Sequence, residues 1–325
     1  QGGQQPQQQQ QGQQGGGDTF TPEELELAAI NSANLSVEEL DELQDRVVTL
    51  LLLLSHADAV VKAFLCTPDN LRQHLKSLQY CLQQPHLAGP SLLKLLRCLR
   101  WLTGEHAVLG PLKEAGAIQT LVPFLSDSAV AALGPQGHEA QVQALHSLYN
   151  ICKFNKKVHL EAAACEGAVP HLCRIAVEGV SASADPTTEA ALTSMAAHNS
   201  NAAGGGQQQF SPLAPELAAA VEALQRWTCV RGFVVPMLVG MASCSPTTRA
   251  CMWNSGGLAA LLALLEVHQD AAMRLGVLQA LDVWLAEDSR PVEQQLVQRD
   301  AVVQLVQVYA NAGQVSGCQQ MSFRY

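Results

Sequence analysis

Charged and aromatic residues are scarce in this chain of 325 residues. Only 15% of the residues are charged and 5% are aromatic, and 29 Asp and Glu outnumber 19 Lys and Arg. A net charge of −10 excludes the basic surface that nucleic-acid binding requires, so we expect no nucleic-acid partner. The chain also lacks an apolar run of about 18 residues, so we expect no transmembrane segment.

The N-terminus has neither a basic stretch nor an apolar core, so it does not resemble a secretory signal peptide. It also lacks an initiating Met, and we expect the chain to be a piece of a longer protein. None of the ten Cys forms a Cys-x-x-Cys pair, and most stand among Leu, Val and Ala. We therefore expect reduced, buried thiols in a cytoplasmic protein rather than a disulfide framework.

Sequence motifs of catalysis are missing as well. The chain has no Gly-rich phosphate loop, no Walker motif and none of the kinase motifs His-Arg-Asp, Asp-Phe-Gly or Val-Ala-Ile-Lys. Gly-x-Ser-x-Gly and His-Glu-x-x-His are also missing, and the ten His are scattered. We therefore predict that these residues are not an enzyme, and we expect no cofactor and no metal.

What the sequence does contain is a repeated helical unit. Within 138–172, Val142, Leu145 and Leu148 recur at three-residue steps and predict one helix, which residues 155–157 interrupt. A short helix follows and ends near Gly167, a residue type that readily takes the left-handed conformation at a helix end. Similar junctions surround Gly116 and Gly256, and a last one without Gly surrounds residue 301.

The spacing of these junctions identifies the type of repeat. Anchored on residues 117, 168, 257 and 301, the steps are 51, 89 and 44 residues. Armadillo and HEAT units are about 40–47 residues long, whereas tetratricopeptide and ankyrin units have about 33–34. We therefore predict an all-α, armadillo- or HEAT-like right-handed helical solenoid, in which stacked neighbours supply the core. The step of 89 is interpreted as one unit with a long insertion.

Composition and periodicity divide the chain into five segments. Residues 1–20 are rich in Gln and Gly and predict a disordered tail. Armadillo-like repeats are expected over 21–177 and again over 213–310, on either side of a low-complexity insertion loop at 178–212. Residues 311–325 are expected to form an irregular tail. On a finer scale, Ser36 starts a capping box and a helix to about Leu54, 83–90 is predicted to be a turn capped by Ser91, and 126–137 a loop.

One row of residues suggests a binding surface. In armadillo proteins the third helix of each unit lines a concave groove, and in peptide-binding members a repeated Asn on that helix holds an extended peptide. Residues 144–152 resemble this third helix, with Asn150 at the Asn position. Alignment of the other third helices places Trp101, Gly240 and Val283 there. The row of Asn is therefore broken, which disfavours uniform binding of an extended basic peptide, as in nuclear import adaptors.

We instead expect one helix or motif of a partner to bind near Trp101, Asn150 and Lys153, with Lys156 and Lys157 completing a small basic patch. Each residue has a structural alternative. Asn150 could make a helix-ending hydrogen bond, and Trp101 could pack in the core. The three Lys could be helix C-terminal charges, which the helix dipole favours.

Residues 116–123 (GAIQTLVP), 144–157 (ALHSLYNICKFNKK) and 166–172 (EGAVPHL) resemble the armadillo region of the plant and algal epsilon-class mitogen-activated protein kinase kinase kinases. These kinases are relatives of the fungal septation-initiation kinases. Segments within 285–306 are also similar, and the resemblance covers about 35–309. The insertion after Val177 and the tail after Asn311 depart from it.

The resemblance implies a serine/threonine kinase with an N-terminal catalytic domain and this non-catalytic solenoid downstream, acting in cell division, cytokinesis and signalling. It implies protein partners in the groove, such as its own kinase domain, a small GTPase or a scaffold. The implied location is cytoplasmic, including the periphery of the plasma membrane or the division site. A stand-alone armadillo adaptor without a kinase stays open as an alternative. A transport receptor for peptides is the alternative that the broken Asn row disfavours.

Overall fold

The computed structural model describes residues 36–57, 59–184, 188, 190, 215–266, 271–287, 289–298, 302–303 and 305–306. The predicted tails at 1–20 and 311–325, and most of the predicted insertion, lie outside these residues. All regular structure in the described residues is helical, which confirms the all-α prediction. The chain divides into two compact units, 1–47 and 48–325, and the boundary falls inside α2 (Val37–Ser55).

The described part of the first unit is the start of α2. The Ser36 hydroxyl accepts a hydrogen bond from the Glu39 amide at 3.2 Å, and the Glu39 carboxylate accepts one from the Ser36 amide at 2.8 Å. This pair is the capping box that the sequence predicts, and the hydrogen bond from the Ser36 amide lowers the pKa of Glu39. The helix therefore begins at the predicted residue.

The described helices from α3 onward, in the second compact unit, form repeats of three helices each. The first helices are α3 (Ala59–Leu65), α6 (His106–Glu114), α10 (Lys156–Ala164) and α14 (Pro246–Asn254). The second helices are α4 (Pro68–Gln83), α7 (Ala117–Leu121) with the 3-10 turn η1 (Val122–Leu125), α11 (Ala168–Ala184) and α15 (Gly257–Glu266). The third helices are α5 (Pro85–Leu102), α9 (Gly137–Cys152), α13 (Pro215–Ala242) and α16 (Ala271–Glu287), and α17 (Ser289–Gln298) begins a further unit.

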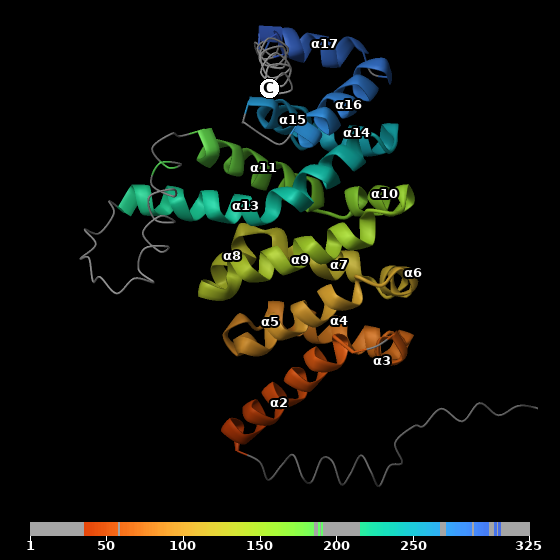
Figure 1. Cartoon of the computed structure of the whole chain (residues 1–325), viewed down its shortest axis with the longest axis vertical. Helices are drawn as coiled ribbons and strands as arrows, with labels where there is room; N and C mark the ends of the chain where they lie inside the picture. Colours follow the sequence, from red (N-terminus) through yellow and green to blue (C-terminus); the bar gives the residue numbers. More distant parts are fainter. Residues whose placement is uncertain are drawn as a thin grey trace, which may run out of the picture. The chain divides into compact units, whose positions relative to one another are not determined.

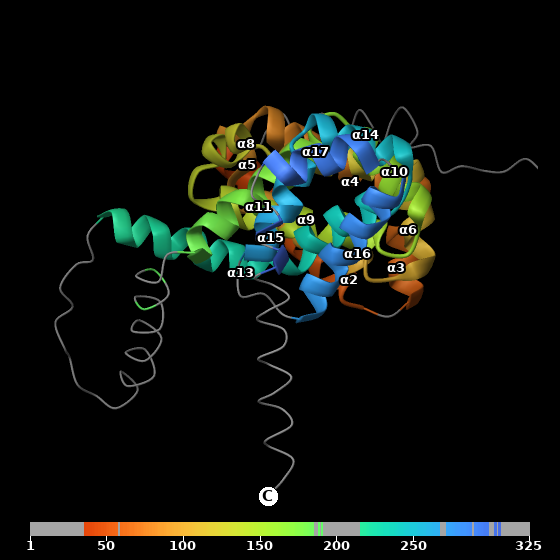
Figure 2. The ribbon, with the colours of Figure 1, turned by 90° about the horizontal axis from the view of Figure 1, so that it is seen from above.

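Helices of the same kind pack on one another from unit to unit. α5 contacts α9, α9 contacts α13 and α13 contacts α16, so the third helices form a continuous layer (Figure 1). Likewise α10 contacts α14, and α11 contacts α15. Seen along the stack, the first helices α6 and α10 lie on the same side (Figure 2). Each unit thus buries apolar surface against its neighbours, which is how a solenoid is stabilised.

A glycine separates the first helix from the second in three of the described units. Gly116, Gly167 and Gly256 have φ values of 88°, 83° and 74°, in the left-handed region that residues with a Cβ rarely adopt. The second helix begins one residue later in each case. The prediction that these glycines mark the repeat junctions is confirmed.

The turn between a third helix and the next first helix is held by local hydrogen bonds. The Asn155 side chain accepts a hydrogen bond from the Lys157 amide at 2.9 Å and starts α10. At α14, Ser245 and Thr248 form a reciprocal capping box, and Pro246 takes the first turn, where no helical hydrogen bond is lost. Polar side chains of the sequence therefore set where α10 and α14 begin.

Two predicted loops are helical instead. Only Gln84 separates α4 from α5, because Pro85 fits the first turn of a helix, so the predicted turn over 83–90 capped by Ser91 is wrong. The segment 126–137 is also not a loop. The Ser126 hydroxyl accepts a hydrogen bond from the Ala129 amide and caps α8 (Asp127–Ala132), and the 3-10 turn η2 (Gly134–Gln136) joins α8 to α9.

The 89-residue step from residue 168 to residue 257 corresponds to a single three-helix unit. α11 and α13 are packed directly against each other as the second and third helices of that unit. α11 runs to Ala184, past the end of periodicity at residue 177, and the Ser183 hydroxyl donates to the Gly179 carbonyl at 2.8 Å. The Ser-rich end of this segment is therefore helical as far as Ala184.

Cysteine burial agrees only in part with the prediction. Cys66, Cys81, Cys98, Cys152 and Cys173 are buried, while Cys229 is exposed on α13. Burial raises the pKa of Cys152 to about 12, so this thiol stays protonated.

In the described part of the chain, no helix is both long enough and apolar enough to cross a membrane.

Candidate protein-binding site

The predicted site residues lie where the third helices α5 and α9 end. Asn150 is only 5% exposed, and its Nδ2 donates to the Thr103 hydroxyl at 3.1 Å. Its Oδ1 accepts a hydrogen bond from the Lys153 ammonium, also at 3.1 Å. The amide therefore joins α9 to the end of α5 and holds Lys153 in place, and its two polar atoms both have partners within the chain.

Lys153 lies among aromatic rings. Its ammonium is 4.8 Å from the centroid of the Phe154 ring and 5.8 Å from that of Tyr149, within the range of cation–π attraction. The Phe154 side chain is 63% exposed, and its ring contacts the His106 ring at 5.5 Å between centroids. Lys153 thus presents a charge beside an apolar surface that the fold leaves uncovered.

Trp101, at the end of α5, is partly exposed rather than buried in the core. Its side chain is 41% exposed, and the indole packs on the His56 ring at 4.1 Å between centroids. The Arg100 guanidinium lies 5.6 Å from the indole centroid and donates to the Gln143 side chain of α9 at 3.1 Å. The core-packing interpretation of Trp101 is therefore wrong, and an arginine lies beside it.

His146 and Phe233 extend the same surface from α9 to α13. The two rings are stacked at 4.4 Å, and Tyr149 lies 5.6 Å from Phe233. Burial, and then the charges of Arg100 and Lys153, lower the pKa of His146 to about 4, so the ring is neutral at pH 7. We name the connected set the aromatic–cationic surface: Arg100, Trp101, His146, Tyr149, Lys153, Phe154 and Phe233.

Lys156 and Lys157 are exposed in the turn that follows. They are the first two residues of α10, whereas Lys153 follows the last residue of α9. The interpretation of all three as favourable C-terminal charges therefore holds for Lys153 alone, because the positive end of the α10 dipole disfavours cations at its start.

The other two positions in the predicted row, Gly240 and Val283, present neither an aromatic nor a cationic side chain. A Cβ at Gly240 would lie 2.6 Å from the His159 ring, so this glycine allows α13 to pack closely against α10. Val283 is half-buried on α16. The sequence pattern therefore located the end of α9 correctly but did not identify Arg100, His146, Phe154 or Phe233. The one available signal was the aromatic Phe154 between Lys153 and Lys156.

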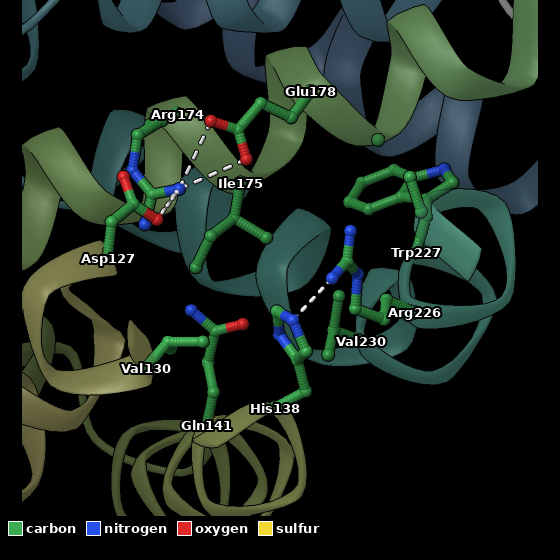
Figure 3. Close-up of a pocket in the computed structure, with 12 residues that line it drawn as sticks. Asp127, Val130, His138, Gln141, Arg174, Ile175, Glu178, Arg226, Trp227 and Val230 are labelled. Carbon is green, nitrogen blue, oxygen red and sulfur yellow. Dashed lines mark hydrogen bonds and ion pairs between the residues drawn. The ribbon is translucent and has the colours of Figure 1, made fainter. Parts of the chain in front are cut away.

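A second candidate site is a cavity of about 160 Å³ between α8, α9, α11 and α13 (Figure 3). On one side of Ile175, Arg174 pairs with Asp127 at 2.5 Å and with Glu178 at 3.0 Å. On the other side, Arg226 contacts the His138 ring and lies 3.7 Å from a carboxylate oxygen of Glu222. Both arginines already face carboxylates, so this cavity offers a ligand no unmatched charge.

No protein-family model matches the chain. MAP3K epsilon protein kinase 2 of Arabidopsis thaliana is 26% identical over 286 residues, which are 88% of this chain and 16% of that kinase. Cytokinesis protein sepH of Emericella nidulans is 23% identical over 78% of the chain, and cell division control protein 7 of Schizosaccharomyces pombe is 23% identical over 81%. The chain spans only 14–19% of the length of these three relatives.

A solved structure has the same fold. A computationally designed armadillo repeat protein for modular peptide recognition matches 86% of this chain, and 89% of its own length, with a TM-score of 0.50 and 14% identity. The predicted resemblance and the predicted armadillo fold are both confirmed. Over most of its length, the chain is homologous to one region of the MAP3K epsilon protein kinases, of cytokinesis protein sepH and of cell division control protein 7, and it folds as an array of armadillo repeats.

Proposed function

We propose that this solenoid is a non-catalytic module that binds a partner protein through the aromatic–cationic surface. The observation that supports the proposal is the exposure of Trp101 and Phe154 beside Arg100 and Lys153. Aromatic and arginine side chains are enriched among residues that dominate protein interfaces, because they bury much area and make directed polar contacts. Lys156 and Lys157 adjoin this surface and belong to the proposed site.

Asn150 has a positioning role in this proposal. Because its amide bonds both Thr103 and Lys153, its loss would release the Lys153 ammonium and loosen the contact between α5 and α9. Partner contact is assigned to Trp101, Lys153 and Phe154, which are exposed. The designed armadillo protein named for peptide recognition supports a protein or peptide ligand, although it is similar in fold alone.

The proposed context is a serine/threonine kinase that acts in cytokinesis signalling. The names of the relatives support it: three are MAP3K epsilon protein kinases, and others are cytokinesis proteins. The chain matches 14–17% of the length of these relatives, so catalysis would reside elsewhere in a longer protein. The stand-alone adaptor is the alternative, and the complete coding sequence decides between them. A Gly-rich loop and a His-Arg-Asp motif outside these residues would support the kinase.

The binding proposal is tested by quantitative affinity capture from an extract of the source cells. The test variant is Lys153→Glu, Phe154→Ala. The matched control is Lys76→Glu, Tyr80→Ala, which changes an exposed lysine and an exposed aromatic ring on α4. We expect proteins captured by the wild-type chain to be lost with the test variant and retained with the control.

Equal capture by both variants would remove the binding role from the aromatic–cationic surface. Circular dichroism of each variant checks that the fold is intact. A test variant that loses helix would be replaced by Trp101→Ala, which removes an exposed ring without changing charge.

A further inference from the structure

Lys153 of the aromatic–cationic surface forms no ion pair with a described carboxylate. Elsewhere Lys62 pairs with Glu105 at 2.6 Å, and Lys113 pairs with Glu161 at 2.7 Å. Lys153 instead donates to the neutral Asn150 amide. Arg100 donates to the Gln143 amide, and its charge, after the hydrogen bond from Arg97, also helps to lower the pKa of Glu139. Lys153 is therefore the cation of this surface whose charge no described carboxylate neutralises.

The turn after this surface adds two more cations of the same kind. Three of the seven lysines of the chain fall within residues 153–157. Lys156 and Lys157 occupy the first turn of α10, where the helix dipole disfavours positive charge, and neither forms an ion pair with a described residue. Local helix stability therefore does not explain these lysines, whereas an acidic ligand does.

Apolar and cationic groups alternate on this surface. The exposed Phe154 ring lies against the Lys153 ammonium, and the exposed Trp101 ring lies near the Arg100 guanidinium. A ligand that covers the surface must bring large apolar side chains to the rings and carboxylates to the cations. A purely charged ligand would leave the rings exposed, and a purely apolar ligand would leave the cations without carboxylates.

Resting on the proposed function, we infer that the partner contributes an acidic segment in which Asp and Glu flank a large apolar side chain. An anionic membrane is the less suitable ligand. Polybasic membrane-binding regions have about 4–8 clustered cations, so the four cations here are at the lower limit. The net charge of −10 of this chain would also oppose approach to an anionic bilayer. A protein segment can meet the local cations while its remainder avoids the acidic regions.

The test is fluorescence anisotropy with the full chain and a synthetic labelled peptide. The peptide has Asp and Glu around one Phe and one Leu, and a control peptide has Asn and Gln in place of the acids. We expect the acidic peptide to bind about tenfold more tightly than the neutral one, and this preference to shrink when NaCl rises from about 50 to about 300 mM.

The informative variant is Lys156→Glu, Lys157→Glu. Because glutamates suit the first turn of a helix, the melting temperature should stay unchanged or rise, while affinity for the acidic peptide should fall about tenfold. The control Lys76→Glu, Arg290→Glu makes the same change in net charge at exposed positions of α4 and α17, and should retain binding within about twofold. Trp101→Ala should weaken binding of both peptides.

Three results would overturn the inference: equal affinity for the two peptides, an equal loss with the control variant, or tighter binding to phosphatidylserine vesicles than to the acidic peptide. The proposed function is judged separately. If affinity capture depends on Lys153 and Phe154 but the chain binds the acidic and the neutral peptide equally, the surface binds proteins whose segments are not acidic. If capture is also independent of these residues, both proposals fail.

Discussion

His74 and His146 make folding sensitive to acid. The Nε2 atom of His74 on α4 lies 3.0 Å from the Leu95 carbonyl oxygen of α5, and burial lowers its pKa to about 4. The pKa of His146 is lowered to the same value by burial and by its two cationic neighbours. An unfolded histidine has a pKa of about 6.5, so the unfolded chain binds protons that the folded chain excludes. The stability from each neutral ring is complete above pH 6.5 and is lost as the pH falls towards 4.

We therefore expect the His74→Gln variant to lose less stability than the wild-type chain between pH 7 and pH 5. Glutamine keeps an amide that can donate to Leu95, but it does not titrate. Each histidine contributes a slope of up to about 1.4 kcal/mol per pH unit in this window. Urea unfolding at several pH values measures the slope, and identical slopes for the two chains would show that His74 does not bind the extra proton.

The candidate site could be located from the sequence but not completed. The Asn position at the end of a third helix pointed to Asn150, and Lys153 follows within one turn. Trp101 packs against His56, and Phe154 packs against His106, which are both distant in the sequence. Contacts between residues 43 or more positions apart are not visible in a local pattern, so Arg100, His146, Phe154 and Phe233 were missed.

At the scale of single helices, replacing either of two helical glycines by alanine should change stability, in opposite directions. A Cβ on Gly179 of α11 would lie 2.2 Å from the Trp227 ring of α13, whereas a Cβ on Gly232 of α13 would meet nothing within 4 Å. Gly179→Ala should destabilise the chain by about 1–3 kcal/mol, because α11 and α13 must separate. Gly232→Ala should stabilise it by about 0.5–1 kcal/mol, because alanine favours the helix.

Urea unfolding measures the free energy of unfolding of both variants and of the wild-type chain. A stabilising Gly179→Ala would mean that the close approach of α11 to α13 is not required for packing. A destabilising Gly232→Ala would mean that this position of α13 is in contact with another part of the chain.

At the scale of the helices, the sequence predicted the glycine junctions between first and second helices better than it predicted where α5 and α8 begin. The left-handed glycines were identifiable because few other residues fit that conformation. The start of α5 could not be identified, because Pro85 is compatible both with a turn and with the first turn of a helix. Ser126 and Asp127 were similarly ambiguous, since these residue types occur both in loops and at helix starts. Packing of α8 against α9 and η1 decides that case.

The array as a whole should be most stable in its middle. α9 packs on α5 on one side and on α13 on the other, and Leu148 within it is 1% exposed. By contrast, α3 leaves Val60 and Phe64 77% and 68% exposed, and α17 leaves Val297 71% exposed. In a solenoid, stability is approximately a sum over units and nearest-neighbour contacts, so helices with one neighbour open more readily than helices with two.

We therefore expect amide hydrogen exchange, followed by mass spectrometry, to be slowest in α9 and α13 and fastest in α3 and α17. Leu148→Ala, which should cost about 2–5 kcal/mol as a buried truncation, tests how far the units are coupled. In a nearest-neighbour array it should raise exchange in α5, α9 and α13 more than in α16, whereas Leu275→Ala, at a side chain 55% exposed on α16, should change little. Equal acceleration in all helices would contradict this, because it would mean that the stacked units unfold as one cooperative body.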